Sequence, residues 1–206
     1  MSLRRFATPP APAPAPGTVP SAAAPPGEAA GEVCELCADP LGDRHGHLVD
    51  REDRRIMCAC RPCSLLFAPD KGQRLRMIPE RYRHDPGFAL TEEDWIFPVR
   101  TAFFFRNSAL GRMVALYPSP AGATESELPL DALERIMAAG PAAAHLEPDV
   151  EALLVDRESG AYLVPIDACY RLVGLVRLHW KGFDGGTEAR DRIDAFFAGL
   201  RERADE

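Results

Sequence analysis

The sequence predicts an α+β protein in which a small cysteine-rich module precedes an antiparallel sheet with helices packed on one face. Three observations lead to this prediction. Five of the six cysteines lie within residues 34–63. The later part of the chain contains apolar patterns with the period of strands and others with the period of helices. The first 31 residues are rich in proline and alanine and match neither pattern.

Composition divides the chain of 206 residues into three parts. Residues 1–31 are expected to form a disordered tail, because proline fixes φ and removes N–H donors. Residues 32–70 form the four-cysteine module, and residues 71–206 form the α+β domain. The net charge of −7 disfavours a general affinity for nucleic acid or anionic membranes. No apolar stretch is long enough to span a membrane. Pro-Ala repeats follow the first arginines in place of an apolar segment, so we expect no secretory signal and a cytoplasmic protein.

The four-cysteine module is predicted from two Cys-x-x-Cys pairs, formed by Cys34 with Cys37 and by Cys60 with Cys63. Each pair suits a tight turn that directs both sulfurs the same way, and the 22 residues between the pairs can bring the turns together. Four thiolates suit zinc, or iron as in rubredoxin or an iron–sulfur cluster. Because four thiolates close the coordination sphere, a structural zinc is expected first and iron is the alternative.

Cys58 complicates the ligand assignment. It lies two residues before Cys60, so on a strand the two side chains face the same side, and Cys58 is an alternative ligand. Pro62 strengthens that alternative, because it removes a backbone N–H that a turn at Cys60 would direct at its thiolate. His45 and His47 could also replace a thiolate, although we expect them to be exposed turn histidines.

Two short strands are expected in the module, at residues 48–49 and 55–57, on either side of the polar turn at residues 50–53. They would form a hairpin that delivers the second cysteine turn, as in zinc ribbons. So small a module has little apolar core, and the bound metal would supply much of its folding free energy.

The α+β domain is expected to contain four or five antiparallel strands and three helices. Alternating polar and apolar residues predict a strand at residues 74–78, and apolar runs rich in strand-forming residues predict strands at residues 101–105, 113–117, 150–155 and 161–165. Helical periodicity predicts helices at residues 131–139, 167–180 and 187–203, which are separated by glycine and proline. Residues 118–126 contain many turn-forming residues and are expected to form a loop.

No catalytic arrangement is recognisable, so the protein is not expected to be an enzyme. Cys169 lies on the apolar stripe of a predicted helix and is expected to be a buried core thiol. Gly185 and Gly186 lie just before a predicted helix, and the sequence does not decide whether a small ligand binds there. Eight basic residues flank the second cysteine turn: Arg54, Arg55, Arg61, Lys71, Arg74, Arg76, Arg81 and Arg83. No aromatic residues lie between them to stack on nucleic-acid bases, so nucleic-acid binding is not favoured.

Several segments together resemble one bacterial family of unknown function, over about residues 32–203. The segments are Cys34-Glu-Leu-Cys37, Cys58-Ala-Cys60-Arg-Pro-Cys63-Ser-Leu-Leu-Phe67, Phe103-Phe-Phe-Arg-Asn-Ser108, Tyr117-Pro-Ser-Pro-Ala-Gly-Ala-Thr-Glu-Ser126 and Leu178-His-Trp-Lys-Gly-Phe-Asp-Gly-Gly186. The resemblance implies a protein that is encoded beside the subunits and maturation factors of uptake nickel–iron hydrogenases. It implies no catalytic residues.

The hydrogenase context suggests comparison with rubredoxin, which also carries two Cys-x-x-Cys turns. This chain is similar only in those turns. It differs in Cys58, in Pro62 and in its long C-terminal domain, which puts a simple electron carrier in doubt.

We therefore expect a non-catalytic accessory protein that assists assembly or maturation of a nickel–iron hydrogenase. Zinc would be held by Cys34, Cys37, Cys60 and Cys63, and an aromatic surface of the α+β domain would contact hydrogenase subunits or maturation factors. One alternative is a rubredoxin-like or iron–sulfur electron-transfer protein of the hydrogenase. Another alternative is a zinc-ribbon regulator that binds nucleic acid.

Overall fold

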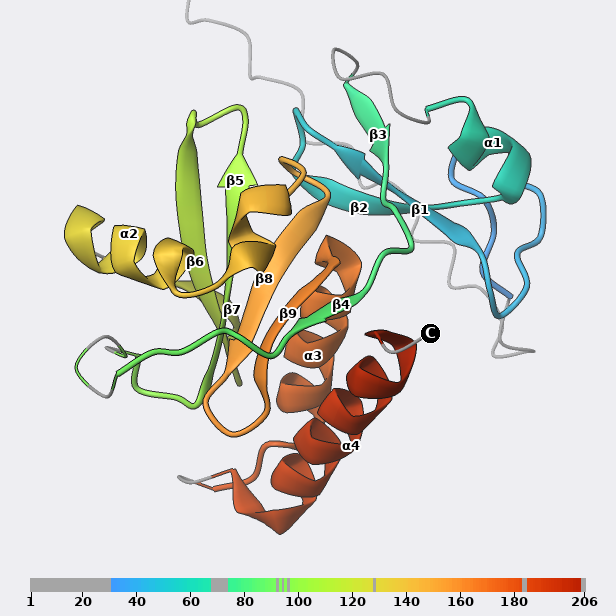
Figure 1. Cartoon of the computed structure of the whole chain (residues 1–206). Helices are drawn as coiled ribbons and strands as arrows, with labels where there is room; N and C mark the ends of the chain where they lie inside the picture. The colour runs from blue at the N-terminus through green and yellow to red at the C-terminus, as the bar shows by residue number, and fades with distance from the viewer. Residues whose placement is uncertain are drawn as a thin grey trace, which may run out of the picture. The chain divides into compact units, whose positions relative to one another are not determined.

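The computed structural model describes residues 31–67, 74–91, 93, 95, 97–127, 129–182 and 185–204 (Figure 1). The predicted tail at residues 1–31, apart from Gly31, lies outside the described residues, as does Lys71. Residues 31–206 belong to one compact unit. In the described part of the chain, no helix is both long and apolar enough to cross a membrane.

A small three-stranded sheet carries the cysteine module. Its strands β1 (Gly46–Asp50), β2 (Arg55–Ala59) and β3 (Leu75–Met77) lie in the order β2-β1-β3, and all pairs are antiparallel. The hairpin predicted before the second cysteine turn is therefore confirmed, and a short helix, α1 (Arg61–Leu65), follows it. The strand predicted at residues 74–78 also forms, but it pairs with β1 instead of joining the larger sheet.

The β1–β2 turn is held by a buried carboxylate. Asp50 Oδ1 accepts hydrogen bonds from the backbone N–H groups of Glu52 and Asp53, at 3.0 and 3.2 Å. The Arg74 guanidinium donates to both Asp50 oxygens, at 2.7 to 3.0 Å. These contacts lower the pKa of Asp50 to about 2, with the Arg74 hydrogen bonds as the largest cause. The same carboxylate thus fixes the turn and joins β3 to it.

A six-stranded antiparallel sheet forms the centre of the remaining chain. Its order is β4-β9-β8-β5-β6-β7, and its strands are β4 (Arg83–Asp85), β5 (Thr101–Asn107), β6 (Arg112–Ser119), β7 (Gly122–Glu125), β8 (Glu151–Asp156) and β9 (Gly160–Pro165). The sequence predicts four or five strands, and the two that it does not predict are the edge strands β4 and β7. β4 has only three residues, and β7 lies in the region expected to be a loop.

Helices cover the two faces of the large sheet (Figure 1). The long helices α3 (Ile166–His179) and α4 (Gly186–Ala204) pack on one face, where Phe103 and Phe105 are buried. The other face, which carries Phe104, is covered by α2 (Leu130–Ala138) and the 3₁₀ helix η2 (Pro141–His145). Successive residues of β5 point to opposite faces, which explains this division. The α+β fold class is confirmed, with short helical elements on the second face as well.

The Asp50 carboxylate predicts a specific loss of stability in acid. Its folded pKa of about 2 lies below the ordinary 3.8, so its contribution is complete above pH 5 and disappears as the pH falls towards 2. We expect Asp50→Asn to lower the unfolding free energy near pH 7 by about 1–2 kcal/mol, and the difference from wild type to shrink below pH 5. Urea unfolding between pH 3 and 7 measures this difference.

The exposed Asp43 provides the matched control, because Asp43→Asn removes the same charge from the same module. A metal–thiolate site would also lose stability in acid, but it would do so equally in both variants. Comparing Asp50→Asn with Asp43→Asn at each pH therefore cancels that contribution. A constant difference between wild type and Asp50→Asn across this pH range would contradict the assignment.

Candidate metal centre

The structure brings Cys34, Cys37, Cys60 and Cys63 together. The sulfur atoms of the four residues all lie within 4.8 Å of one another, and Sγ of Cys37 is 3.7 Å from Sγ of Cys60. The first pair lies on a turn that is closed by a hydrogen bond from the Ala38 N–H to the Cys34 carbonyl oxygen, at 2.8 Å. Cys60 is the residue directly before α1, and Cys63 lies within that helix.

The sulfur spacing fits a tetrahedral metal ion. A zinc–sulfur bond of about 2.3 Å places the sulfurs of a tetrahedral site about 3.8 Å apart. The Cys37–Cys60 separation of 3.7 Å agrees with this value, and the remaining separations stay within 4.8 Å. The four thiols could therefore hold a metal ion with little movement of the chain. Zinc and a single iron have the same geometric requirement, so the spacing does not choose between them.

Backbone amides prepare the first cysteine turn for negative charge. N–H groups donate to the Cys34 sulfur, with that of Cys60 the largest contribution, and they lower the pKa of Cys34 to about 6. The Asp39 amide acts in the same direction on Cys37, but the neighbouring thiols and burial outweigh it and raise the pKa of Cys37. Thiols this close cannot all ionise without a cation, and a bound metal ion provides that charge.

Exposure differs strongly around the four-thiol group. Cys34 is 1% exposed and packs with Leu48, Met57 and Ala59, whereas Cys37 is exposed. Large apolar side chains close to these cysteines in sequence are exposed as well: Val33, Leu36, Leu65 and Leu66. The group thus has a buried base and an apolar, solvent-facing rim.

Cys58 belongs to a different group of side chains. It lies on β2, where its sulfur is within 4.8 Å of one ring nitrogen of His45 and one of His47. The histidines are not the exposed turn residues expected from the sequence, because the side chain of His45 is only 9% exposed and that of His47 is 30% exposed. His47 contacts Asp167 of α3, which is 120 residues away in the chain, and the local sequence alone does not contain that information.

Many of the basic residues that flank the second cysteine turn are already paired with carboxylates. Arg55 contacts Glu35, Arg74 contacts Asp50 and two further acids, Arg76 contacts Glu147, and Arg81 contacts the buried Glu151. Compensated charges attract phosphate groups less strongly than free ones do. The arrangement gives little support to nucleic-acid binding.

The structure gives Cys169 and Gly185 roles in packing. Cys169 is fully buried on α3, and burial raises the pKa of its thiol well above the usual value, as expected for a core cysteine. At Gly185, whose φ is +85°, an added Cβ would lie 2.9 Å from the Trp180 ring. The Lys181 N–H also donates to the Gly185 carbonyl oxygen, at 3.1 Å. Close packing of this turn on Trp180 thus explains Gly185. At Gly186, with φ of +73°, an added Cβ would make only an ordinary contact with the Lys181 carbonyl oxygen, at 3.7 Å.

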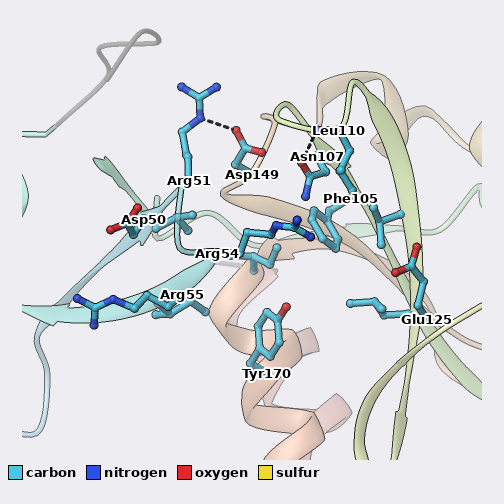
Figure 2. Close-up of a pocket in the computed structure, with 15 residues that line it drawn as sticks. Asp50, Arg51, Arg54, Arg55, Phe105, Asn107, Leu110, Glu125, Asp149 and Tyr170 are labelled. Atoms are coloured by element: carbon cyan, nitrogen blue, oxygen red, sulfur yellow. Dashed lines mark hydrogen bonds and ion pairs between the residues drawn. The ribbon is translucent and has the colours of Figure 1, made fainter. Parts of the chain in front are cut away.

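A cavity of about 170 Å³ lies between the β1–β2 hairpin and the large sheet (Figure 2). Its wall includes Phe105 from β5 and Tyr170 from α3, and three arginines of the hairpin line it: Arg51, Arg54 and Arg55. Figure 2 shows Arg51 pointing towards Asp149, with a distance of 3.0 Å between Nε and Oδ2. None of the described residues that line the cavity is a cysteine, so the cavity is separate from the four-thiol group.

Together, the fold and the four-thiol group define an α+β protein with a cysteine cluster that could hold a metal ion. Residues 33–204 match a family described as "Family of unknown function (DUF5947)", and the chain belongs to this family. The resemblance to a family of unknown function is thereby confirmed. No curated protein and no solved structure matches the chain.

Cobalt substitution distinguishes Cys60 from Cys58 as a ligand of the four-thiol group. We expect Cys60→Ser to lose the absorption of a four-thiolate cobalt site, because one of the four sulfurs is removed. The matched variant Cys58→Ser removes a thiol only two residues away and should keep that absorption. The visible spectrum of each cobalt-loaded variant measures the effect. Loss of the four-thiolate bands in Cys58→Ser alone would reverse the assignment.

Proposed function

We propose that this chain is a non-catalytic, cytoplasmic accessory protein whose four-cysteine group holds a structural zinc ion. The single observation that carries the proposal is the packing of four sulfurs within 4.8 Å, with backbone amides directed at the two sulfurs of the first turn. A four-thiolate site has no free position for substrate or water, which favours a structural role over catalysis. The ion would hold the first cysteine turn against α1, where the apolar core contains few side chains.

The proposed partner is a subunit or maturation factor of a nickel–iron hydrogenase, which is the context implied by the sequence resemblance. We locate the contact on the rim of the four-thiol group, where Leu36, Leu65 and Leu66 are exposed. The sequence favours an aromatic surface of the α+β domain instead. However, the aromatic run of β5, Phe103 to Phe105, lies in the core, with each residue at most 9% exposed.

Electron transfer is the second candidate function, because one sulfur of the group reaches the surface. Cys37 is exposed, and a single iron in the same four-thiolate site would be close enough to solvent to exchange electrons with a docked protein. This candidate requires iron in place of zinc, so the metal itself separates the two functions.

Metal analysis of protein purified without oxygen tests both candidates together. We expect zinc, no stoichiometric iron and a colourless solution, because a zinc–thiolate site has no visible transitions. Elemental analysis combined with a visible absorption spectrum makes the measurement. Stoichiometric iron with thiolate charge-transfer bands that bleach on reduction would overturn the structural role and support the redox one.

A charge placed on the apolar rim tests the partner surface. We expect Leu66→Glu to weaken capture of hydrogenase subunits by about tenfold or more, because the exposed side chain would be desolvated in the complex. Leu178→Glu is the matched control, since Leu178 is 77% exposed and Leu66 72% exposed, but Leu178 lies near the end of α3. Quantitative co-purification from the native host measures capture.

A deletion strain tests the biological role directly. Hydrogenase subunits should accumulate unprocessed when the gene is deleted, and the wild-type gene should restore processing where the Leu66→Glu gene does not. Normal processing in the deletion strain would overturn the accessory role, whatever metal the protein contains.

A further inference from the structure

The β1–β2 hairpin carries a second group of metal-ligating side chains, formed by His45, His47 and Cys58. One ring nitrogen from each histidine and the cysteine sulfur lie within 4.8 Å of one another. The two rings are in edge-to-face contact, with their centroids 4.8 Å apart. The group shares no residue with the four-thiol group, although Cys58 and Cys60 are only two positions apart in the chain.

Strand pairing brings these three side chains together. In the antiparallel register of β1 and β2, His47 lies directly opposite Cys58, so their side chains project from the same face of the sheet. His45 lies just before β1, and one of its ring nitrogens comes within 4.8 Å of the His47 and Cys58 ligand atoms. Leu48 and Met57, which are neighbours on the opposite face, pack into the apolar core with Cys34. The hairpin thus directs Leu48 and Met57 to one face, and His47 and Cys58 to the other, where Val49 joins the core of the large sheet.

The two imidazoles are oriented by hydrogen bonds that their Nδ1–H groups donate. Nδ1 of His47 lies 2.7 Å from Oδ2 of Asp167, in the first turn of α3, and Nδ1 of His45 lies 3.0 Å from the Gly42 carbonyl oxygen. Both acceptors favour the tautomer in which Nδ1 carries the proton, which leaves the Nε2 lone pair for a metal. A histidine oriented by a carboxylate or a backbone carbonyl is the usual arrangement around protein-bound zinc.

The Nε2 atom of His45 lacks a partner that its tautomer requires. It is buried and has no hydrogen-bond partner among the described residues. Buried polar atoms of this kind are uncommon, because losing water without gaining a hydrogen bond costs free energy. The closest acidic group is the Glu32 carboxylate, whose Oε2 lies 3.5 Å from this atom and whose side chain is largely exposed. A cation between them would satisfy both groups.

We propose that His45, His47 and Cys58 bind a second transition-metal ion, of the zinc type. Two imidazoles and one thiolate are borderline-soft ligands that suit Zn²⁺ far better than Mg²⁺ or Ca²⁺. Three protein ligands leave a fourth position, for which the Glu32 carboxylate or a water molecule is available. The second site therefore differs in kind from the closed four-thiol group, and it explains why the module contains a fifth cysteine.

An ion at the second site would affect the contact between the small sheet and α3. His47 connects β1 to Asp167 at the start of α3, and the first turn of that helix lies close to the hairpin in Figure 1. An ion on His47 would therefore strengthen the contact between the small sheet and α3, because a metal-bound imidazole donates more strongly to its carboxylate partner. Asp167 acts as a positioning residue for the ion and is not itself a ligand.

Zinc stoichiometry on the full chain provides the first test. After loading with zinc and removal of excess metal, we expect two zinc ions per wild-type chain and one in Cys58→Ser and in His47→Gln. His145→Gln is the matched control, because it changes an exposed histidine far from the group in sequence, and it should keep two ions. A single zinc ion in wild type that is unchanged in Cys58→Ser and His47→Gln would overturn the proposal.

Cadmium-113 NMR identifies which site each ion occupies and serves as the folding control. We expect two resonances from wild type, one with the strong deshielding of four thiolates and one shifted upfield by nitrogen ligands. His45→Gln and Cys58→Ser should lose only the second resonance, and the surviving four-thiolate signal shows that the module is folded. If only the upfield resonance appears in wild type, the four-thiol assignment fails while the second site stands.

Asp167→Asn tests the positioning role separately from ligation. We expect it to keep both resonances but to weaken zinc binding at the second site by about 10–100-fold, measured by competition with a coloured chelator. The four-thiol affinity should not change. Equal affinities in wild type and Asp167→Asn would show that the carboxylate does not support an ion on His47.

Discussion

Strand β1 is the element on which the rest of the structure depends, because its two faces belong to two different cores. Leu48 packs with Cys34 and Met57 beneath the four-thiol group, while the next residue, Val49, joins the core of the large sheet and its long helices. The period of two along a strand makes this division unavoidable. A shift of one residue in the β1–β2 register would exchange the two sets of side chains and would dismantle both cores together.

Polar contacts follow the same division. On the face of β1 that meets the large sheet, His47 contacts Asp167 and Arg51, just after the strand, contacts Asp149. On the other face, Asp50 holds the turn and Arg74. The cysteine module is therefore fixed to the α+β fold by apolar packing and by charged pairs. A metal ion in either group of ligands would act on the same hairpin, although the two groups share no residue.

The proposed functions share one physical requirement, which is a rigid module that keeps thiolates at fixed separations. Backbone amides directed at Cys34 and Cys37 supply part of that requirement before any ion binds. The ion supplies the rest, because four close thiols repel one another when ionised. When the module is rigid, the exposed rim around Leu66 presents a constant surface to a partner. A binding role of this kind requires no catalysis.

The sequence by itself determined the α+β class, the central strands, the three main helices and the two Cys-x-x-Cys turns, because periodicity and ligand spacing are local properties. Only the tertiary structure decided that β3 pairs with β1, that short edge strands β4 and β7 exist, and that Cys58 lies with His45 and His47. Those features depend on strand pairing between distant residues. The His-x-His pattern was visible in the sequence, but its partner cysteine became identifiable only when the β1–β2 register placed Cys58 opposite His47.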